Sequence, residues 1–464
     1  MDKINLQQKR LILFFVLFSS IFIPFSIKNA QFGILSHTNA YLLEKAMLIR
    51  LTGHFEVAGF VYPPVPFLLA LLYPNTLFFA ASGTLLWSLL ATFLVRDIWL
   101  LKISWPVKIA VLLVTLFNPY ATSLALYNTA DALGLLLIYL SWNSFKVYMQ
   151  ESLSFHAMIS GICLGVASFS IPIAIYCALI FPLFYASTKT LKQWQESLAV
   201  SFMIAFPALS AIVIWGYVSW LFTGHPVWGY PSVIENHTSF EIPLATLPVF
   251  FATSLILLIS RFYRLLAVQI FPLIFLFFLK QNLGSEALVA GFILLFSLIH
   301  LPKILPIWGK PILVVAIIVQ AILSFQTKPT QNEWTAYLSK ENQIEIAAAH
   351  LLASAPKHSI LTDDQGTYQL IAQTGTAAPY RVPSSIYYDQ IATHPADYIS
   401  YVLINNGHGN GLLERYIHHP PKGMILDAHF SHYVLYRKPS APPLLYQWIH
   451  PNFFDGNKLH RGPK

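Results

Sequence analysis

Long apolar runs are the feature that most constrains this sequence. Between residues 11 and 325 they recur again and again, and short segments between them hold most of the polar residues. A run of roughly 18 or more apolar residues can cross the hydrocarbon core of a bilayer. Only 10% of the chain is charged, whereas soluble domains carry about 25%. The sequence therefore predicts a polytopic membrane protein and excludes a chain of soluble domains.

We expect about eleven transmembrane helices, and the shorter runs should extend into their flanking residues. Basic residues precede the first run, and no small-residue cleavage motif follows it, which favours an uncleaved span over a signal peptide. The fifth and sixth runs could instead form one helix kinked near Pro172. The predicted spans are residues 11–27, 76–95, 107–117, 130–142, 156–168, 172–185, 198–222, 244–259, 265–279, 287–300 and 311–325.

The distribution of Lys and Arg predicts the orientation of these spans. If the N-terminus is cytoplasmic and the spans alternate, the inner segments hold 13 Lys/Arg. The outer loops then hold only Lys28, Lys45, Arg50 and Lys280. Because Lys and Arg concentrate in cytoplasmic loops, we expect a cytoplasmic N-terminus and an extracytoplasmic C-terminus. The expected location is a bacterial inner membrane.

Charge density divides the chain into two predicted domains. Residues 1–326 carry 27 charged side chains, and the 138 residues of 327–464 carry 21, nearly twice the density. We therefore expect a transmembrane domain over 1–326, with a long outer loop at 28–64, and an extracytoplasmic domain over 327–464. A helical pattern at 342–353 and short apolar runs at 359–362, 398–404 and 432–436 predict a small α/β domain there, with a partly parallel sheet and 432–436 at its edge.

The outer loop at 28–64 is the first place to look for chemistry. Apolar residues between 40 and 51 recur at helical spacing, which predicts an amphipathic helix lying in the membrane interface. The fold class that follows from the whole sequence is mainly α, with about eleven transmembrane helices and a small C-terminal α/β domain.

A series of short motifs resembles one family. After the interfacial helix come Tyr62-Pro63-Pro64, Asn118-Pro119-Tyr120 and Asn128-Thr129-Ala130-Asp131, then Gly161–Gly165 and Leu221-Phe222-Thr223-Gly224-His225-Pro226. Their order along the membrane path is similar to that in the GT-C superfamily of polyprenyl-phosphate-sugar-dependent glycosyltransferases, which includes protein O-mannosyltransferases and the lipid A aminoarabinose transferase. The resemblance implies a GT-C-like fold and an inverting transfer of sugar, at the outer face, from a polyprenyl-phosphate donor to a glycan, lipid or protein acceptor.

The resemblance also exposes a difference. The family places an acidic residue early in the first outer loop, where it activates the acceptor or binds a metal, and Asn39 stands there in this sequence. An amide cannot act as a general base. The alternative is therefore a catalytically inactive GT-C-like scaffold or a lipid-binding subunit of a membrane assembly. A transporter is disfavoured, because the chain lacks the internal repeats of that class.

Three carboxylates on the outer side are candidate catalytic residues: Glu44, Glu56 and Asp131. An ionisable group near a span is costly and marks a candidate site. Structural roles compete with this interpretation, since Glu44 could pair with Lys45 or Arg50 and Asp131 could cap its helix.

A donor phosphate needs cations and hydrogen-bond donors, and a sugar ring suits aromatic faces. The candidate substrate-binding residues are Lys45, Arg50, His54, Tyr62, His225, Trp228, His237 and Lys280. No metal site is predicted: the spacing of the tail histidines, such as His429 and His432, suggests zinc, but they have no cysteine partners and spacing alone is a poor guide. A divalent metal at the donor phosphate is left open. The expected partners are the polyprenyl-phosphate lipid, the acceptor and the membrane, with no nucleic acid; the oligomeric state is open.

Overall fold

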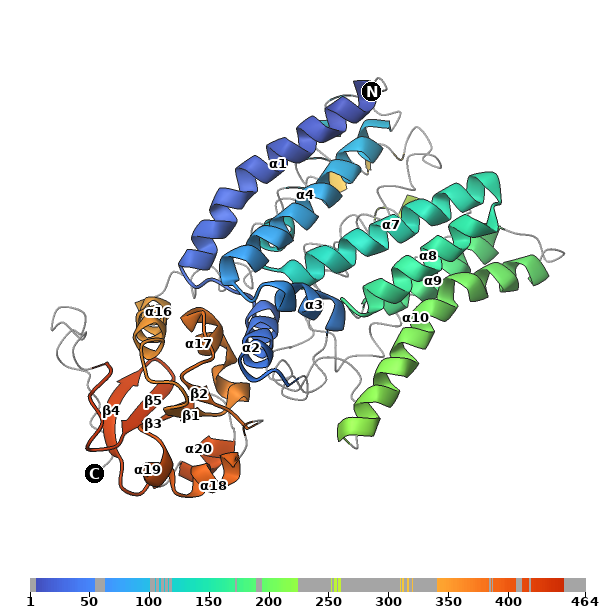
Figure 1. Ribbon diagram of the computed structural model, residues 1–464. Coiled ribbons are helices and arrows are strands. Elements are labelled where there is room, and N and C mark those ends of the chain that lie inside the picture. The colour runs from blue at the N-terminus through green and yellow to red at the C-terminus, as the bar shows by residue number, and fades with distance from the viewer. Residues whose placement is uncertain are drawn as a thin grey trace, which may run out of the picture. The chain divides into compact units, whose positions relative to one another are not determined.

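The computed structural model covers the chain from end to end, and helices dominate it (Figure 1). The chain forms two compact units. The membrane unit comprises Met1–Lys28, Tyr62–Leu68 and Phe79–Asn332, and the sheet unit comprises Asn29–Val61, Leu69–Phe78 and Glu333–Lys464. Apart from a few isolated positions, the structure describes residues 6–54, 63–100, 119–171, 173–188, 194–223, 340–383, 387–405, 411–416 and 419–445.

Apolar helices form the described part of the membrane unit. Among the described residues, three helical segments are long and apolar enough to cross a membrane, namely Gln8–Gln31, Thr76–Leu100 and Trp194–Leu221, as expected for an integral membrane protein. The helices are α1 (Leu6–Gln31), α3 (Pro64–Leu72), α4 (Thr76–Leu100), α6 (Pro119–Leu126), α7 (Thr129–Glu151), α8 (Ser154–Ser168), α9 (Ile173–Thr188) and α10 (Trp194–Thr223).

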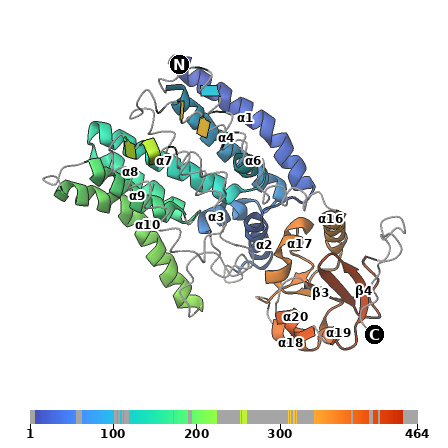
Figure 2. The same ribbon diagram turned by 180° about the vertical axis from the view of Figure 1, so that it is seen from behind.

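The structure decides one alternative left open by the sequence. Helix α8 ends at Ser168 and α9 begins at Ile173, so these two apolar runs form two helices and not one kinked helix. Helices α7 to α10 pack together in Figures 1 and 2. The predicted spans at 107–117, 244–259, 265–279, 287–300 and 311–325 fall wholly or mostly outside the described residues, so the expected total of eleven remains a prediction.

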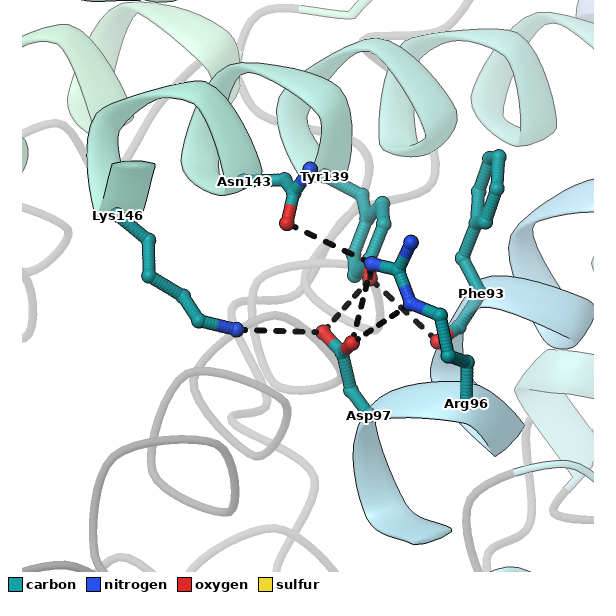
Figure 3. A network of polar contacts seen from close by, with 6 residues as sticks. All are labelled: Phe93, Arg96, Asp97, Tyr139, Asn143 and Lys146. Atoms are coloured by element: carbon teal, nitrogen blue, oxygen red, sulfur yellow. Dashed lines mark hydrogen bonds and ion pairs between the residues drawn. The ribbon is translucent and has the colours of Figure 1, made fainter. Parts of the chain in front are cut away.

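A polar network joins α4 to α7 (Figure 3). Asp97 accepts hydrogen bonds from the Tyr139 hydroxyl at 2.7 Å and from Arg96 Nε at 3.1 Å. Lys146 Nζ lies 4.0 Å from the same carboxylate, and Arg96 Nη2 reaches the Asn143 side-chain oxygen at 3.5 Å. A buried carboxylate is stable only when it is paired and hydrogen-bonded, so this network accounts for Asp97 on an apolar helix.

The sheet unit contains a five-stranded sheet with the strand order β2-β1-β3-β5-β4. Strands β2, β1 and β3 run parallel, whereas β5 runs antiparallel to both β3 and β4. This confirms the predicted partly parallel sheet. Its strands are β1 (Ile360–Thr362), β2 (Tyr380–Arg381), β3 (Tyr401–Asn405), β4 (Ile425–Phe430) and β5 (Tyr433–Arg437).

Helices cover both faces of this sheet (Figures 1 and 2). Helices α16 and α17 lie on one side, and α18, α19 and α20 lie on the other, where Leu361, Val402 and Ile404 form a core with Ile391 and Leu412. This alternation of strands and covering helices is typical of an α/β layer structure. The helices are α2 (His37–Thr52), α16 (Lys340–Leu352), α17 (Asp364–Thr374), α18 (Tyr388–Thr393), α19 (Pro395–Tyr398) and α20 (Gly411–Tyr416).

Two sequence expectations for this unit differ from the structure. The segment 432–436 was expected at the sheet edge, but β5 lies between β3 and β4, and β4 is the edge strand on that side. Strand β4 is half exposed and carries Asp427, so its sequence lacks a continuous apolar signal. Helix α2 is buried at Asn39, Ala40 and every residue from 42 to 49, and is not a one-sided amphipathic helix. Its expected location in the membrane interface remains a prediction.

Candidate functional site

Helix α2 and helix α17 pack against each other in an antiparallel arrangement within the sheet unit. Lys45, in the second half of α2, contacts Asp364, the first residue of α17. About two helical turns earlier on α2, His37 Nδ1 lies 2.7 Å from the Tyr368 hydroxyl. Residues three or four apart lie on one face of a helix, so one polar stripe of α2 faces one polar stripe of α17.

The N-terminal end of α2 is fixed by hydrogen bonds. The Ser36 hydroxyl accepts a hydrogen bond of 3.1 Å from the Asn39 amide, which is an N-cap. Just before the helix, the Gly33 carbonyl accepts a bond of 3.1 Å from Gln373 Nε2 of α17. Gly33 has φ +67°, and a Cβ there would lie 2.5 Å from Ile346 of α16. A glycine is therefore required where the chain enters α2.

Lys45 is the centre of the candidate site. Its ammonium pairs with the Asp364 carboxylate and lies 3.5 Å from Glu44 Oε2. It also lies over the Tyr41 ring, 5.5 Å from the ring centre. Burial alone lowers the pKa of Lys45, but the carboxylates of Glu44 and Asp364 outweigh burial and hold that pKa above its ordinary value. The site therefore presents a permanent cation flanked by two acids.

Glu44 is fully buried. Its side chain has no exposed surface, and within the described part of the chain neither carboxylate oxygen makes a hydrogen bond. Burial is the main cause that raises the pKa of Glu44 to about 8; Lys45 opposes this shift and the Asp364 carboxylate adds to it. Near neutral pH the group is therefore largely protonated. Burial also raises the pKa of the neighbouring Tyr41 to about 12.

The sheet places Asp364 at a position suited to ligands. Asp363 and Asp364 follow β1 directly, and β1 lies between β2 and β3 in the parallel part of the sheet. The chain leaves β1 toward β2 on one side, and β3 lies on the other, so β1 and β3 flank a switch point of the topology. Ligands of open α/β sheets bind outside the carboxyl ends of strands at such points. The β1–α17 turn thus places an acid beside Lys45.

Two predicted substrate-binding residues lie at the end of α2, beyond this cluster. Arg50 is exposed, and its guanidinium donates a hydrogen bond to the Leu72 carbonyl. His54 is exposed and follows Gly53, whose left-handed backbone conformation ends the helix. Glu44 contacts Lys45 rather than Arg50, which decides between its two expected ion-pair partners.

Asp131 lies in the membrane unit, near the start of α7. It is buried, and its carboxylate accepts a hydrogen bond from the Asn128 side chain. Asn128 is the residue that precedes the helix, and it makes no side-chain cap bond to the backbone. The hydrogen bond between Asp131 and Asn128 is a local contact at the start of the helix. Among the described contacts, the Asp131 carboxylate has no cation beside it.

The other predicted site residues lie outside the described residues, and their roles remain predictions: Glu56, Tyr62, His225, Trp228, His237 and Lys280. Within the described part of the chain, no three His, Cys, Asp or Glu side chains group as metal ligands.

Asp364 and Tyr368 are the site residues that sequence reasoning missed. In the sequence, Asp363 and Asp364 stand directly after the predicted strand at 359–362. The real partner of Asp364, Lys45, is 319 residues away along the chain. The only sequence signal would have been the isolated pair of acids at the carboxyl end of a predicted parallel strand.

Solved structures of known proteins resemble this chain. It aligns with the crystal structure of ArnT from Cupriavidus metallidurans bound to undecaprenyl phosphate, with a TM-score of 0.55 and 12% identity, over 92% of this chain and 98% of that chain. The apo structure of the same ArnT gives a TM-score of 0.55 and 11% identity, over 91% and 97%. No protein-family model and no curated protein matches. The chain therefore has the fold of ArnT, which confirms, at the level of the fold, the resemblance indicated by its motifs.

Proposed function

We propose that this protein is a membrane glycosyltransferase that takes a sugar from a polyprenyl-phosphate donor and transfers it, with inversion, to an acceptor at the outer face. The observation that carries this proposal is the buried Lys45 ammonium between Glu44 and Asp364. It occurs in a chain with the fold of a protein crystallised with undecaprenyl phosphate. The proposed topology is a cytoplasmic N-terminus and an extracytoplasmic domain over residues 327–464. The acceptor class is a glycan, a lipid or a protein.

The proposed reaction is a direct displacement at the anomeric carbon. The acceptor hydroxyl gives its proton to a carboxylate, and its oxygen forms the new bond to the anomeric carbon. The bond from that carbon to the phosphate oxygen breaks, and the phosphate keeps the electron pair. Lys45, with Arg50 and Lys280, is proposed to stabilise the negative charge of the leaving phosphate, because a fixed cation acts strongly where charge develops.

Glu44 and Asp131 are the described candidates for the base, and Glu56 is a third. A pKa of about 8 brings Glu44 close to the operating pH, which favours general acid–base catalysis. Its complete burial, however, requires the acceptor to reach a carboxylate that has no exposed surface in this arrangement. Asp131 is 8% exposed. Five further residues are proposed as donor contacts on the grounds of residue type alone: Tyr62, Trp228, His54, His225 and His237.

A second candidate function is a non-catalytic lipid-binding relative of the same fold. The observations that favour it are Asn39 at the start of α2 and the burial of Glu44, because an amide cannot accept a proton and a buried acid cannot touch an acceptor. Such a protein would bind a polyprenyl phosphate without releasing one from a sugar donor.

Release of undecaprenyl phosphate by the wild-type protein separates the two candidate functions, and single substitutions of the acids test which of them is the base. We expect Glu44→Gln or Asp131→Asn to lower the kcat of sugar transfer by about 10²- to 10⁴-fold, the range of a lost general base. The assay follows undecaprenyl phosphate released from a panel of undecaprenyl-phosphate-linked sugars by the purified full chain. Asp397→Asn, an exposed acid of α19, is the matched control. Turnover unchanged in both single variants would refute the assignment of the base.

A further inference from the structure

The ammonium of Lys45 is enclosed as well as paired. Its side chain is 7% exposed, and that of its partner Asp364 is 13% exposed. A phosphate monoester and a carboxylate offer a lysine the same chemistry, that of an anionic oxygen accepting a charge-assisted hydrogen bond. Because so little of the Lys45 side chain is exposed, a second anion as large as a phosphate has no room to contact its ammonium while Asp364 is paired with it.

The surroundings of the Asp364 carboxylate are those of an anion site. Asp364 begins α17, an 11-residue helix whose first backbone amides have no partner inside the helix. Helix N-termini attract phosphate through these amides and the helix dipole. A second, independent observation is Glu44, which is completely buried 3.5 Å from Lys45 with no hydrogen bond to either carboxyl oxygen within the described residues. In its protonated form this carboxyl is a hydrogen-bond donor that could serve a phosphate oxygen.

We propose that Asp364 is an internal competitor for the donor phosphate: its carboxylate occupies the phosphate position on Lys45, and the lipid phosphate displaces it. The proposal rests on the proposed function, because it takes the ligand of Lys45 to be a polyprenyl phosphate. It adds a residue of the C-terminal segment to the donor site. It also makes α17, which contacts β3, the element that links donor binding to the sheet.

The exchange requires only the side chain of Asp364 to turn away. The helices stay joined through contacts that do not involve Lys45, namely Tyr368 with His37 at 2.7 Å and Gln373 with the Gly33 carbonyl at 3.1 Å. Asp364 is the first residue of its helix, where a side chain is freer to change rotamer than in a helix interior. The phosphate would then gain Lys45, the first amides of α17 and the Glu44 carboxyl.

The test is equilibrium binding of undecaprenyl phosphate to the purified full chain in lipid nanodiscs, at about pH 6, where Glu44 is protonated. Asp364→Asn removes the competing charge, and we expect its Kd to fall by about tenfold. Asp364→Ser keeps a side chain that favours a helix start and should give the same result if the Asn variant does not fold. Asp364→Glu restores the competitor and should bind like the wild type. Asp397→Asn is the matched control and should also bind like the wild type.

The outcomes separate this proposal from the proposed function. If Lys45→Gln binds as tightly as the wild type, Lys45 does not hold the phosphate and the proposed function loses its central residue. If Lys45→Gln binds more weakly but folded Asp364→Asn and Asp364→Ser bind no tighter than the wild type, only the competitor proposal is overturned. If inorganic phosphate at millimolar concentration displaces the lipid from the wild type but not from Lys45→Gln, the shared ligand is the phosphate group itself.

Discussion

Glu44 lies in an environment far from the one in which a carboxyl group is ordinarily found. Burial raises the pKa of its side chain from 4.5 to about 8, so the folded protein binds a proton that the unfolded chain has already lost in this range. The stabilising proton is fully present below about pH 4.5, and its contribution is lost as the pH rises toward 8. The folded protein should therefore lose stability with rising pH across this window.

Glu44→Gln removes this pH dependence. Relative to the wild type, we expect the variant to gain about 1–3 kcal/mol of stability between about pH 5 and pH 8, because its amide never ionises in the buried site. The midpoint of thermal unfolding in detergent measures the difference. Asp397→Asn, at an exposed position of α19, is the control and should follow the wild type. A constant difference between Glu44→Gln and the wild type at all pH values would contradict this explanation.

For individual residues, the sequence indicated which side chains are candidates for the site but not which residues they contact. Acids and cations are both scarce on the predicted outer side, which is why Glu44 and Lys45 became candidates. Their neighbour Asp364 could not be predicted, because an ion pair across 319 residues depends on tertiary packing, and no local pattern records it. Asp131 was predicted as either a site acid or a helix cap; its carboxylate accepts a hydrogen bond from the Asn128 side chain, and both roles remain predictions.

Among the helices, the contact of α8 with α10 shows what a sequence motif does physically. Gly161 and Gly165 were singled out as part of a family resemblance, and the structure gives them a packing role. A Cβ on Gly161 would lie 2.3 Å from the Met203 carbonyl, and one on Gly165 would lie 3.0 Å from Pro207 Cβ. Small residues four apart allow two apolar helices to approach closely. The glycines therefore set the distance between α8 and α10.

Gly161→Ala should separate these two helices. The added methyl group meets backbone and not a movable side chain, so we expect a loss of about 1–3 kcal/mol, the usual cost of overpacking. The measurement is the midpoint of thermal unfolding in detergent. Ile162→Ala, at a neighbouring position that is 48% exposed, is the control and should cost less. Equal losses in the two variants would show that the close approach of α8 and α10 is not what Gly161 provides.

Hydropathy predicted where the helices lie along the chain, but it did not predict which helices and strands pack against each other. The apolar runs predicted α1, α4 and α10. Of the two alternatives for the runs on either side of Pro172, the prediction of two separate helices is confirmed. The order of strands in the sheet was only partly predicted, because a half-exposed edge strand such as β4 has a weak pattern of its own. Burial of α2 on nearly all sides was missed, because part of its cover comes from α17, more than 300 residues later.

For the whole molecule, we propose that a membrane chain with the fold of ArnT uses Lys45 to hold the phosphate of a polyprenyl-linked sugar donor. The most direct measurement is the release of undecaprenyl phosphate from undecaprenyl-phosphate-linked sugars by the purified full chain in nanodiscs. We expect release from at least one sugar of the panel, and a loss of about 100-fold or more in Lys45→Met, because the charge on the leaving phosphate is no longer balanced. No release from any donor, or equal turnover in Lys45→Met, would contradict this claim.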